Sequence, residues 1–417
     1  MPETAIPQED TWDSTPAFFS EGYRFISNRC ARMNTDVFDT RIMFKKATCV
    51  TGEDAARMFY HPDRFTRQGA IPPTTVKLLQ DKGSVQTLSG NLHRHRKKMF
   101  MSLMSTESIQ RLVRITEAEW HQKLKKWEGM DRVVLHPEVQ EILTRSVCRW
   151  AGIPLSDSDA KKRTHEFAAM IEGAGTVGPR NWLGLVLRAR SERWGRGFIR
   201  GVRKQKVKVL EGSAADVTAW YRNPEGDLLD DKVAAVELIN FLRPTVAVAR
   251  YIAFAALALH QHPDWRRKLQ SGADDDLEMF AQEVRRFYPY FPAVAGRVQI
   301  PFTWRGRGFK KGDWIMLDLY GTNRDPRSWK APDTFDPERF RKWDESPFNF
   351  IPQGAGNHDD THRCPGEWIT IELIKNALSQ LTGRMRYDVP QQNHHIDLSR
   401  IPAITKSRFI ITHVRSA

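Results

Sequence analysis

Apolar and polar side chains alternate along much of the chain with the period of an α-helix. This period predicts amphipathic helices over residues 92–104, 107–127, 138–151 and 276–287. Asp230 and Asp231 can cap a long helix that runs to about His260, and Pro365 suits the first turn of a last long helix. The pattern therefore predicts a protein that is dominated by helices.

Strand-like patterns are short, and they cover residues 38–50, 294–304, 313–318 and 408–414. They do not alternate with helices as βαβ units do, which argues against a Rossmann or barrel enzyme. The predicted fold class is mainly α with small β-sheets. Since neither a Gly/Ser-rich or Pro-rich linker nor an internal repeat divides the 417 residues, we expect a single domain over residues 1–417.

The most apolar predicted helix, residues 237–259 (ELINFLRPTVAVARYIAFAALAL), contains Arg243 and Pro244 near its middle. The proline removes a helical hydrogen bond and kinks the helix. The arginine places a charge in a core helix, where it needs an anionic partner. A protein carboxylate such as Glu237 and a bound carboxylate are both possible partners at this point.

Charge and targeting signals narrow the range of partners. The net charge is +14, and residues 188–210 hold the densest basic cluster, with the spacing of an amphipathic helix that has a solvated basic face. No nucleic-acid-reading motif accompanies it, so we expect no nucleic-acid partner. The N-terminus lacks the basic start and apolar core of a signal peptide, and Arg250 shortens the longest apolar run. We expect a cytoplasmic protein without membrane insertion.

The four cysteines show neither CxxC nor zinc-site spacing, and they lie too far apart to indicate a disulfide framework. They are Cys30, Cys49, Cys148 and Cys364. Cys364 stands at the predicted start of the last helix, where the helix dipole is expected to lower its pKa and favour the thiolate. Gly354 and Gly356 allow the backbone to approach a bulky group closely. From chemistry alone, a ligand, a nucleophile and a small buried thiol remain open.

The sequence around Cys364, FNFIPQGAGNHDDTHRCPGEW, resembles the haem-binding loop of the cytochrome P450 family. The elements of that loop are supplied by Gly354, Gly356, His362, Cys364 and Gly366. One departure is that seven residues, rather than three, separate Gly356 from Cys364. The resemblance implies the cytochrome P450 fold and haem b as cofactor, with Cys364 as the thiolate ligand of the iron, which favours cleavage of an O–O bond.

Further motifs of the same family follow in the expected order. Glu283 and Arg286 in EVRR match its Glu-x-x-Arg pair, and Arg339 in FDPERF matches the third member of that ion-pair triad. The resemblance also implies a set of residues that bind the haem propionates. These are His93, Lys97, Arg297 and His362, with Lys97 at a position where the family normally has arginine.

Most members of the family carry an acid–Thr pair at the kink of the central helix, where this chain has Arg243 and Pro244. The LRPTVA segment and the long cysteine loop resemble the bacterial fatty-acid peroxygenases. This branch uses hydrogen peroxide directly, without an obligatory redox partner. The resemblance implies that Arg243 binds the carboxylate of a long-chain fatty acid, and that this carboxylate serves as general acid–base for the peroxide. A haem propionate stays open as another partner of Arg243.

The position of attack follows from this binding mode. With the carboxylate held at Arg243 beside the iron, the α and then the β carbon carry the nearest C–H bonds. Gln86 occupies the position where alkene-forming decarboxylases of the branch carry histidine, and the chain is most similar to the α-hydroxylating members. Motif offset places three further residues along the tunnel for the fatty-acid chain, and these are Gln80, Ala174 and Ala293.

Other functions remain open at this stage. The chain could be a reductase-dependent monooxygenase whose basic surface binds an acidic ferredoxin, or a decarboxylase that forms terminal alkenes. A haem-carrying lipid-binding or sensor protein, or a basic nucleic-acid binder, would be the alternative to an enzyme. Arg243 and Pro244 argue against the monooxygenase, because they replace the residues that would relay protons to oxygen.

Overall fold

The structure is a computed structural model that describes residues 6–417, so the first five residues of the N-terminal segment lie outside it. Most of the chain is helical, which confirms the predicted fold class. The helices are α1 (Thr15–Glu21), α2 (Phe25–Met33), α3 (Glu53–Phe59), α4 (Pro73–Leu79), α5 (Gly90–Met101), α6 (Thr106–Trp127), α7 (Leu135–Trp150), α8 (Asp157–Gly173), α9 (Pro179–Arg203), α10 (Ala214–Trp220), α11 (Asp231–Ala247), α12 (Ala249–Gln261), α13 (Pro263–Leu269), α14 (Asp274–Phe287), α15 (Leu319–Thr322) and α16 (Glu367–Ser379).

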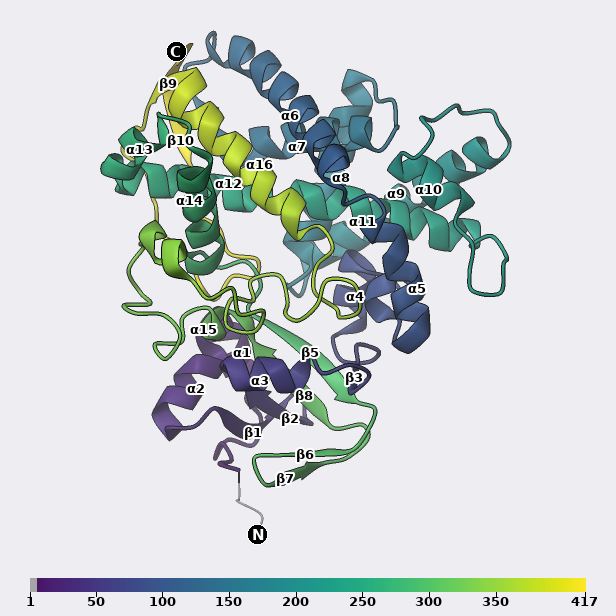
Figure 1. Ribbon diagram of the computed structural model, residues 1–417, viewed down its shortest axis with the longest axis vertical. Helices are drawn as coiled ribbons and strands as arrows, with labels where there is room; N and C mark the ends of the chain where they lie inside the picture. The colour runs from purple at the N-terminus through teal and green to yellow at the C-terminus, as the bar shows by residue number, and fades with distance from the viewer. Residues whose placement is uncertain (1–5) are drawn as a thin grey trace.

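Three small sheets accompany the helices, and the largest has the strand order β1-β2-β8-β5-β3. Within it β2 and β8 run parallel, whereas the other neighbours run antiparallel. Figure 1 shows this sheet with α1–α3 at one end of the molecule and most of the helices at the other. The strands are β1 (Val37–Ile42), β2 (Lys45–Val50), β3 (Phe65–Thr66), β4 (Val133–Val134), β5 (Ala293–Val298), β6 (Phe302–Trp304), β7 (Arg307–Phe309), β8 (Trp314–Asp318), β9 (Met385–Asp388) and β10 (Ile410–Ser416).

Two of the predicted strands are wrong, because each range forms two strands in the structure. Residues 38–50 form the hairpin of β1 and β2, because Met43 and Phe44 both adopt the left-handed backbone region (φ 52° and 61°) and reverse the chain. Such a turn normally contains Gly, Asn or Asp, so neither Met43 nor Phe44 signals it. Residues 294–304 are likewise divided between β5 and β6, which belong to different sheets.

The long core helix begins where the sequence predicts. Asp230 is its N-cap, and its side chain accepts a hydrogen bond from the backbone N–H of Lys232. Pro244 lies inside α11, and the helix is interrupted at Val248 before it continues as α12. The hydroxyl of Thr245 donates to the carbonyl of Phe241 at 2.9 Å, a side-chain hydrogen bond of the kind that often accompanies a helix bend.

The combined rod from Asp231 to Gln261 is, by length and composition, apolar enough to cross a membrane. However, 94% of its most apolar window is buried inside the protein, as expected for a core helix.

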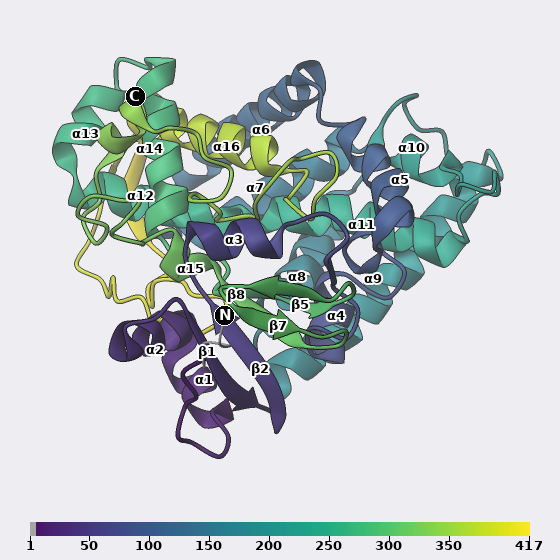
Figure 2. The ribbon, with the colours of Figure 1, turned by 60° about the horizontal axis from the view of Figure 1, so that its bottom comes forward.

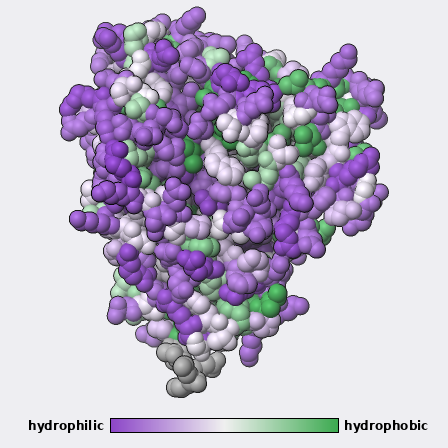
Figure 3. Space-filling model, in the orientation of Figure 1, coloured by the Kyte–Doolittle hydropathy of each residue, from purple (hydrophilic) through white to green (hydrophobic). Residues whose placement is uncertain are grey.

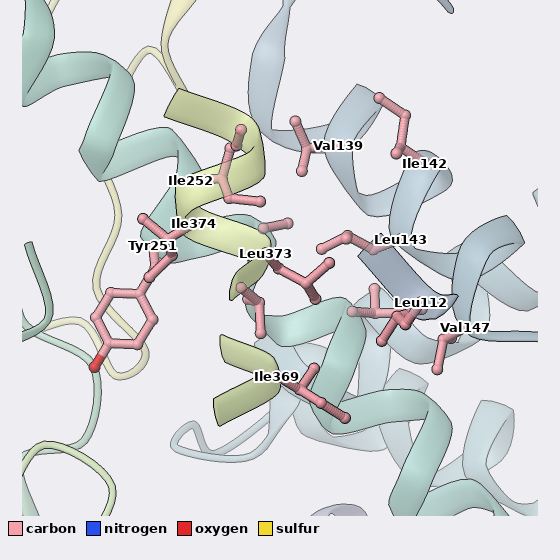
Figure 4. Close-up of a cluster of buried hydrophobic side chains, with 14 of the residues drawn as sticks. Leu112, Val139, Ile142, Leu143, Val147, Tyr251, Ile252, Ile369, Leu373 and Ile374 are labelled. Atoms are coloured by element: carbon pink, nitrogen blue, oxygen red, sulfur yellow. The ribbon is translucent and has the colours of Figure 1, made fainter. Parts of the chain in front are cut away.

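The hydrophobic core fixes the position of α16, the helix that follows Cys364. Figure 4 shows its side chains packed among those of α6, α7 and α12. Fully burying one such aliphatic side chain contributes about 1.5–3 kcal/mol, so the start of α16 is held firmly against the central helices. The labelled residues of this cluster are Leu112, Val139, Ile142, Leu143, Val147, Tyr251, Ile252, Ile369, Leu373 and Ile374.

Candidate functional site

Cys364 lies in the loop that leads into α16, and its backbone N–H donates to the carbonyl of Gln353 at 3.0 Å. It is half-buried, whereas Cys30, Cys49 and Cys148 are fully enclosed in the hydrophobic core. Cys364 is therefore the one cysteine that is partly accessible, whereas the other three are packed in the core.

The two glycines of this loop are needed for its own folding. Gly354 and Gly356 have φ values of +101° and +80°. A Cβ at Gly354 would lie 3.1 Å from the Cα of Arg363, and one at Gly356 would lie 2.9 Å from Cγ2 of Thr361. The atoms that leave no space for a side chain at these two positions thus belong to the loop and its surroundings.

The extra residues before Cys364 form a closed turn. The hydroxyl of Thr361 donates to the carbonyl of Ala355 at 2.8 Å, and Arg363 donates to the carbonyl of Gly356 at 3.1 Å. The insertion relative to the usual family pattern is therefore built into the loop by its own hydrogen bonds.

Glu367, in the first turn of α16, ties this loop to α14. Its carboxylate accepts from His358 at 3.0 Å and from Arg363 at 2.7 Å, and it forms a buried ion pair with Arg285. Burial alone would raise its pKa, but Arg285 and the other donors hold the pKa of Glu367 well below its usual range. The carboxylate remains charged and anchors the cysteine loop.

The expectation that the helix start lowers the pKa of Cys364 is wrong. Burial raises the pKa of this thiol, and the nearby Glu367 carboxylate adds to the effect. The Gly366 N–H and the cations of Lys97 and Arg285 act in the opposite direction but do not compensate. A coordinating metal ion deprotonates a thiol outright, so a ligand role does not require a low pKa beforehand.

Arg243 extends from α11 into the same region. Its side chain is buried, Nη2 donates to the carbonyl of Leu79 at 2.6 Å, and Nε has no hydrogen-bond partner among residues 6–417. Burial lowers its pKa to about 9, and neighbouring Arg188 adds to this, whereas Tyr290 and Cys364 act in the opposite direction. Arg243 is thus a buried cation that is close enough to Cys364 to interact with it.

Glu237 is not the partner of Arg243. Its carboxylate pairs with Arg96 at 2.8 Å and accepts from the backbone N–H of Val85 at 2.9 Å. Asn240 donates to its second oxygen at 3.2 Å. Within residues 6–417, no carboxylate lies within ion-pair distance of Arg243, so its charge is left for a group outside the chain.

Gln86 lies next to the same helix. Asn240, one turn before Arg243, donates to Oε1 of Gln86 and to the carbonyl of Gln80, both at 3.3 Å. The segment 80–86 is thereby held against the face of α11 that carries Arg243. Pro244 is the next residue of the helix. It has no backbone N–H and no polar side chain, so its effect is a local break in the helical hydrogen bonding.

Three of the expected propionate ligands lie together at the cysteine loop. The rings of His93 and His362 are 4.0 Å apart, and Lys97 donates to the carbonyl of Arg363 at 2.8 Å and to that of Thr361. Burial lowers the pKa of His93 to about 4 and that of Lys97 to about 8, and it keeps the pKa of His362 well below its usual range.

Arg297 is oriented toward other partners. Its guanidinium donates to the carbonyls of Gly69 and Gly312 and stacks on Trp314 at 5.1 Å. Arg67, a residue that the motifs did not identify, instead lines a cavity of about 40 Å³ together with His93 and His362. Its place follows from strand pairing, since Thr66 faces Arg297 across β3 and β5. The propionate role of Arg297 stays a prediction.

Tyr290 is a second residue that sequence reasoning missed. It stacks on Tyr251 with ring centroids 4.2 Å apart, and burial together with the charge at Cys364 raises its pKa. Arg243 acts on it in the opposite direction, so this ring lies near both site residues. Its only sequence signal is its place in the aromatic segment after the Glu-x-x-Arg motif.

The predicted ion-pair triad is present. Arg286 contacts Glu283 at 2.7 Å, and Arg339 contacts the same carboxylate at 3.2 Å. Both partners of the first pair are fully buried, and Glu283 also accepts from the backbone N–H of Asp336 at 2.8 Å. The triad therefore joins α14 to the segment that precedes the cysteine loop.

These side chains suit haem. A half-buried thiol at a helix start offers the iron ligand, the buried guanidinium of Arg243 has an unused donor, and a basic cavity lined by Arg67, His93 and His362 matches two carboxylates that need cationic or hydrogen-bonding partners. Arg243 and Lys97 are buried cations without a carboxylate partner among residues 6–417, and such groups favour an anionic partner from outside the chain.

Comparison with known proteins defines the class. Residues 277–407 match the family model of cytochrome P450. Cytochrome P450 71A8 of Mentha piperita is 28% identical over 46% of this chain, and the match covers 42% of that protein, so the chain spans less than half of the first curated relatives. Cytochrome P450 family 716 subfamily AD polypeptide 2 of Citrus sinensis is 21% identical, with 83% of this chain and 76% of that protein covered.

Solved structures match over nearly the whole chain. Cytochrome P450SP alpha (CYP152B1), crystallised with (R)-ibuprofen, is 45% identical, with 97% of this chain and 99% of that chain covered and a TM-score of 0.94. Cytochrome P450EX alpha (CYP152N1) with myristic acid is 41% identical, with 99% and 100% covered and a TM-score of 0.96. A phenylalanine-to-alanine variant of cytochrome P450 OleT, in complex with arachidonic acid, is 34% identical, with 99% of both chains covered and a TM-score of 0.96.

The chain belongs to the cytochrome P450 family, and its cofactor is haem b. Within the family, its resemblance to the bacterial fatty-acid peroxygenases is confirmed by these solved relatives.

Replacing Lys97 by alanine is expected to weaken haem retention. The side chain is buried and holds the carbonyls of Thr361 and Arg363, so its loss removes two charge-assisted hydrogen bonds from the cysteine loop. Haem content per protein and the melting temperature after gel filtration measure the effect. The neighbouring exposed Lys98→Ala is the matched control and should behave like the parent. Equal haem content in both variants would contradict the assignment.

Proposed function

We propose that the protein is a haem-thiolate peroxygenase that uses hydrogen peroxide to hydroxylate long-chain fatty acids at the α carbon, with the β carbon as the next position. The observation that carries the proposal is Arg243, a buried guanidinium near Cys364 that has no carboxylate partner within residues 6–417. A fatty-acid carboxylate supplies the missing charge in a bidentate pair.

Arg243 has two roles in this mechanism. It binds the substrate carboxylate, and it fixes that carboxylate where it can accept a proton from hydrogen peroxide and return it, as general acid–base. The usual acid–Thr pair is replaced by Arg243 and Pro244, so the substrate itself brings the acid. When bound, haem with a thiolate ligand favours cleavage of the O–O bond.

Position selectivity follows from the same anchor. Because the carboxylate is held beside Cys364, the carbon next to it carries the C–H bonds closest to the reaction centre. The apolar chain must extend away from Arg243, and Gln80 and Ala174 border the elements that meet there. The tunnel roles of Gln80, Ala174 and Ala293 remain proposals.

The roles of the remaining residues are assigned in the same proposal. Cys364 binds the haem iron, and His93, Lys97, Arg297 and His362 hold or neutralise the propionates. Because Arg67 lines the same basic cavity as His93, it belongs to this group as well.

The protein needs no obligatory redox partner in this proposal. The insertion beside Cys364 exposes Asp359 and Asp360, and these carboxylates would repel an acidic ferredoxin that approached the cysteine loop. Figure 3 shows that the face seen in Figure 1 is mostly hydrophilic. The remaining elements of the proposal are one haem-thiolate domain over residues 1–417, a cytoplasmic location and no nucleic-acid partner.

Product analysis tests the proposal directly. Purified protein with hydrogen peroxide and a long-chain fatty acid should yield mainly the 2-hydroxy acid, without NAD(P)H, ferredoxin or reductase. Turnover only with those electron donors would support a conventional monooxygenase instead. Mainly terminal alkene would support a decarboxylase, and protein without a Soret band would support a function without haem.

A Gln86→His variant is expected to raise the fraction of alkene modestly. A neutral amide does not offer the proton that a histidine can, and Gln86 is held next to the arginine helix by Asn240. The ratio of 2-hydroxy acid to terminal alkene, measured by gas chromatography, gives the result. Gln86→Asn keeps the amide and is the control, which should retain the parental ratio. An unchanged ratio in the histidine variant would remove Gln86 from the selectivity argument.

A further inference from the structure

Helix α9 carries a buried arginine that the proposed function does not use. Arg188 is fully buried, and its Nε donates to the carboxylate of Glu192, one turn later on the helix, at 2.7 Å. Its Nη1 contacts the sulfur of Met170, a weak acceptor, at 3.9 Å, and its Nη2 has no hydrogen-bond partner among residues 6–417. A buried donor without an acceptor costs free energy, so the Nη2 side of Arg188 favours a further oxygen atom.

The charge of Arg188 is already balanced within the chain. Glu192 also pairs with Lys77 at 2.8 Å, and Lys77 pairs with Asp81 at 2.7 Å. Two cations and two carboxylates therefore form one network, in which Arg188 has an unused nitrogen. Since the charges of the network cancel, the acceptor that Arg188 lacks can be a neutral oxygen, and no second carboxylate is required.

The network lies next to the proposed carboxylate anchor. Lys77 and Leu79 are two positions apart on α4, and the carbonyl of Leu79 accepts from Arg243 at 2.6 Å. Figure 2 shows α4 beside α8 and α9, and both of these helices also contact α11, which carries Arg243. Burial lowers the pKa of Arg243 and the charge of Arg188 lowers it further, so the two guanidinium groups are close enough to repel each other.

Arg188 also reaches the proposed tunnel for the fatty-acid chain. Met170, which Nη1 of Arg188 contacts, and Ala174 are four positions apart at the end of α8 and lie on one face of it. Ala174 is one of the proposed tunnel residues, and Gln80, another of them, directly follows Leu79. The helix face that would line the tunnel is therefore in contact with a buried guanidinium, for which an alkyl chain offers no acceptor.

We propose that Arg188 forms a second substrate subsite, which selects long-chain fatty acids with a hydroxyl or keto oxygen on the chain. The carboxylate binds Arg243, and the chain oxygen accepts a hydrogen bond from Nη2 of Arg188. Because the two guanidinium groups are near each other, this oxygen lies in the half of the chain closer to the carboxylate. The inference rests on the proposed function, because it names the class of fatty acid that the same site takes.

An oxygen on the chain has opposite effects on affinity with and without this subsite. In an entirely apolar tunnel, burying an unpaired hydroxyl or carbonyl costs free energy, so an oxygenated acid binds more weakly than the plain acid. A hydrogen bond from a buried guanidinium is charge-assisted and reverses this order. The sign of the difference in affinity therefore tests the subsite.

Equilibrium binding in the absence of peroxide measures that difference. The haem-loaded protein is titrated calorimetrically with myristic acid and with hydroxymyristic acids that carry one hydroxyl at successive carbons beyond the β carbon. We expect at least one isomer with its hydroxyl in the half nearer the carboxylate to bind about tenfold more tightly than myristic acid. Arg188→Met, which has a similar length but no donor, should lose this preference, while Glu192 keeps its pair with Lys77.

The matched control is another arginine of α9 whose carboxylate also keeps a second partner. Arg190 is exposed and pairs with Glu166, which remains paired with Arg163 when Arg190 is replaced. Arg190→Met should therefore retain the parental preference. Arg188→Lys is a second test variant in case the methionine variant is unstable. It keeps a cation beside Glu192 but lacks the planar fork, so it should fold like the parent and lose most of the preference.

The outcomes separate the subsite from the proposed function. A preference for a chain-hydroxylated acid in the parent and in Arg190→Met, lost in the Arg188 variants, supports the subsite. Myristic acid that binds and is hydroxylated with peroxide, while no hydroxylated isomer binds more tightly or the preference survives in Arg188→Met, would overturn the subsite alone. Equal weakening of all the acids by Arg188→Met would assign Arg188 to the carboxylate anchor and also overturn it. If none of the acids binds the parent, both proposals fail.

Discussion

An Arg243→Ala variant is expected to lose fatty-acid peroxygenation almost completely. Removing one partner of a buried, hydrogen-bonded charge pair costs about 3–5 kcal/mol, and each 1.36 kcal/mol is a factor of ten in rate. Substrate binding and proton transfer fail together, so kcat/KM with fatty acid and peroxide should fall by at least about 10²-fold. Arg243→Lys should recover only part of the activity, because lysine lacks the planar fork.

A short carboxylic acid provides the second half of this test. The parent should oxidise a substrate without a carboxyl group poorly, and adding a short acid should raise that rate, because the acid occupies Arg243 and restores the proton-transfer group. The Arg243→Ala variant should show no such increase. Parental turnover of fatty acid by the alanine variant, or no effect of the short acid on the parent, would make Arg243 structural and contradict the mechanism.

Stability should change in the opposite direction from activity. Burial opposes the charge of Arg243, whose Nε has no partner and whose pKa is lowered to about 9. A base with a lowered folded-state pKa binds fewer protons in the folded than in the unfolded state, so its charge costs stability at neutral pH and the cost falls as the pH rises above about 9. Replacement by an apolar residue of similar length, Arg243→Met, should therefore raise the melting temperature while abolishing activity.

The sequence predicted the long helices and the cysteine loop for a physical reason. Amphipathic periodicity and capping residues such as Asp230 are local signals, and the cysteine loop is a contiguous motif. Arg67 and Tyr290 could not be found in this way. Arg67 reaches the basic cavity through strand pairing, and Tyr290 reaches the region of Arg243 by stacking on Tyr251, so tertiary contacts alone place them.

The errors also have physical causes. The β1–β2 turn uses Met43 and Phe44 in a backbone conformation that favours other residues, so alternation alone could not divide the strands. The pKa of Cys364 was expected to fall because the helix dipole was considered without burial, and desolvation is the larger effect. From the sequence, Glu237 and a carboxylate from outside the chain are both possible partners of Arg243. Glu237 pairs with Arg96 instead, and Arg96 lies 141 positions from Glu237 in sequence, so no local pattern shows this pair.

Cys364→Ala is expected to abolish the spectral signature of thiolate ligation. Reduced parent protein with carbon monoxide should show the strongly red-shifted Soret band of a haem-thiolate centre, because the thiolate donates electron density to the iron. Without the sulfur, no other side chain in the loop replaces it as a soft anionic ligand, so that band should disappear and haem content should fall.

Cys148→Ala is the matched control. Cys148 is buried in α7 among apolar side chains, and burial raises its pKa, so its removal should cost packing energy but preserve the band. If Cys364→Ala kept the red-shifted band, or if Cys148→Ala lost it while remaining folded, Cys364 would not be the iron ligand.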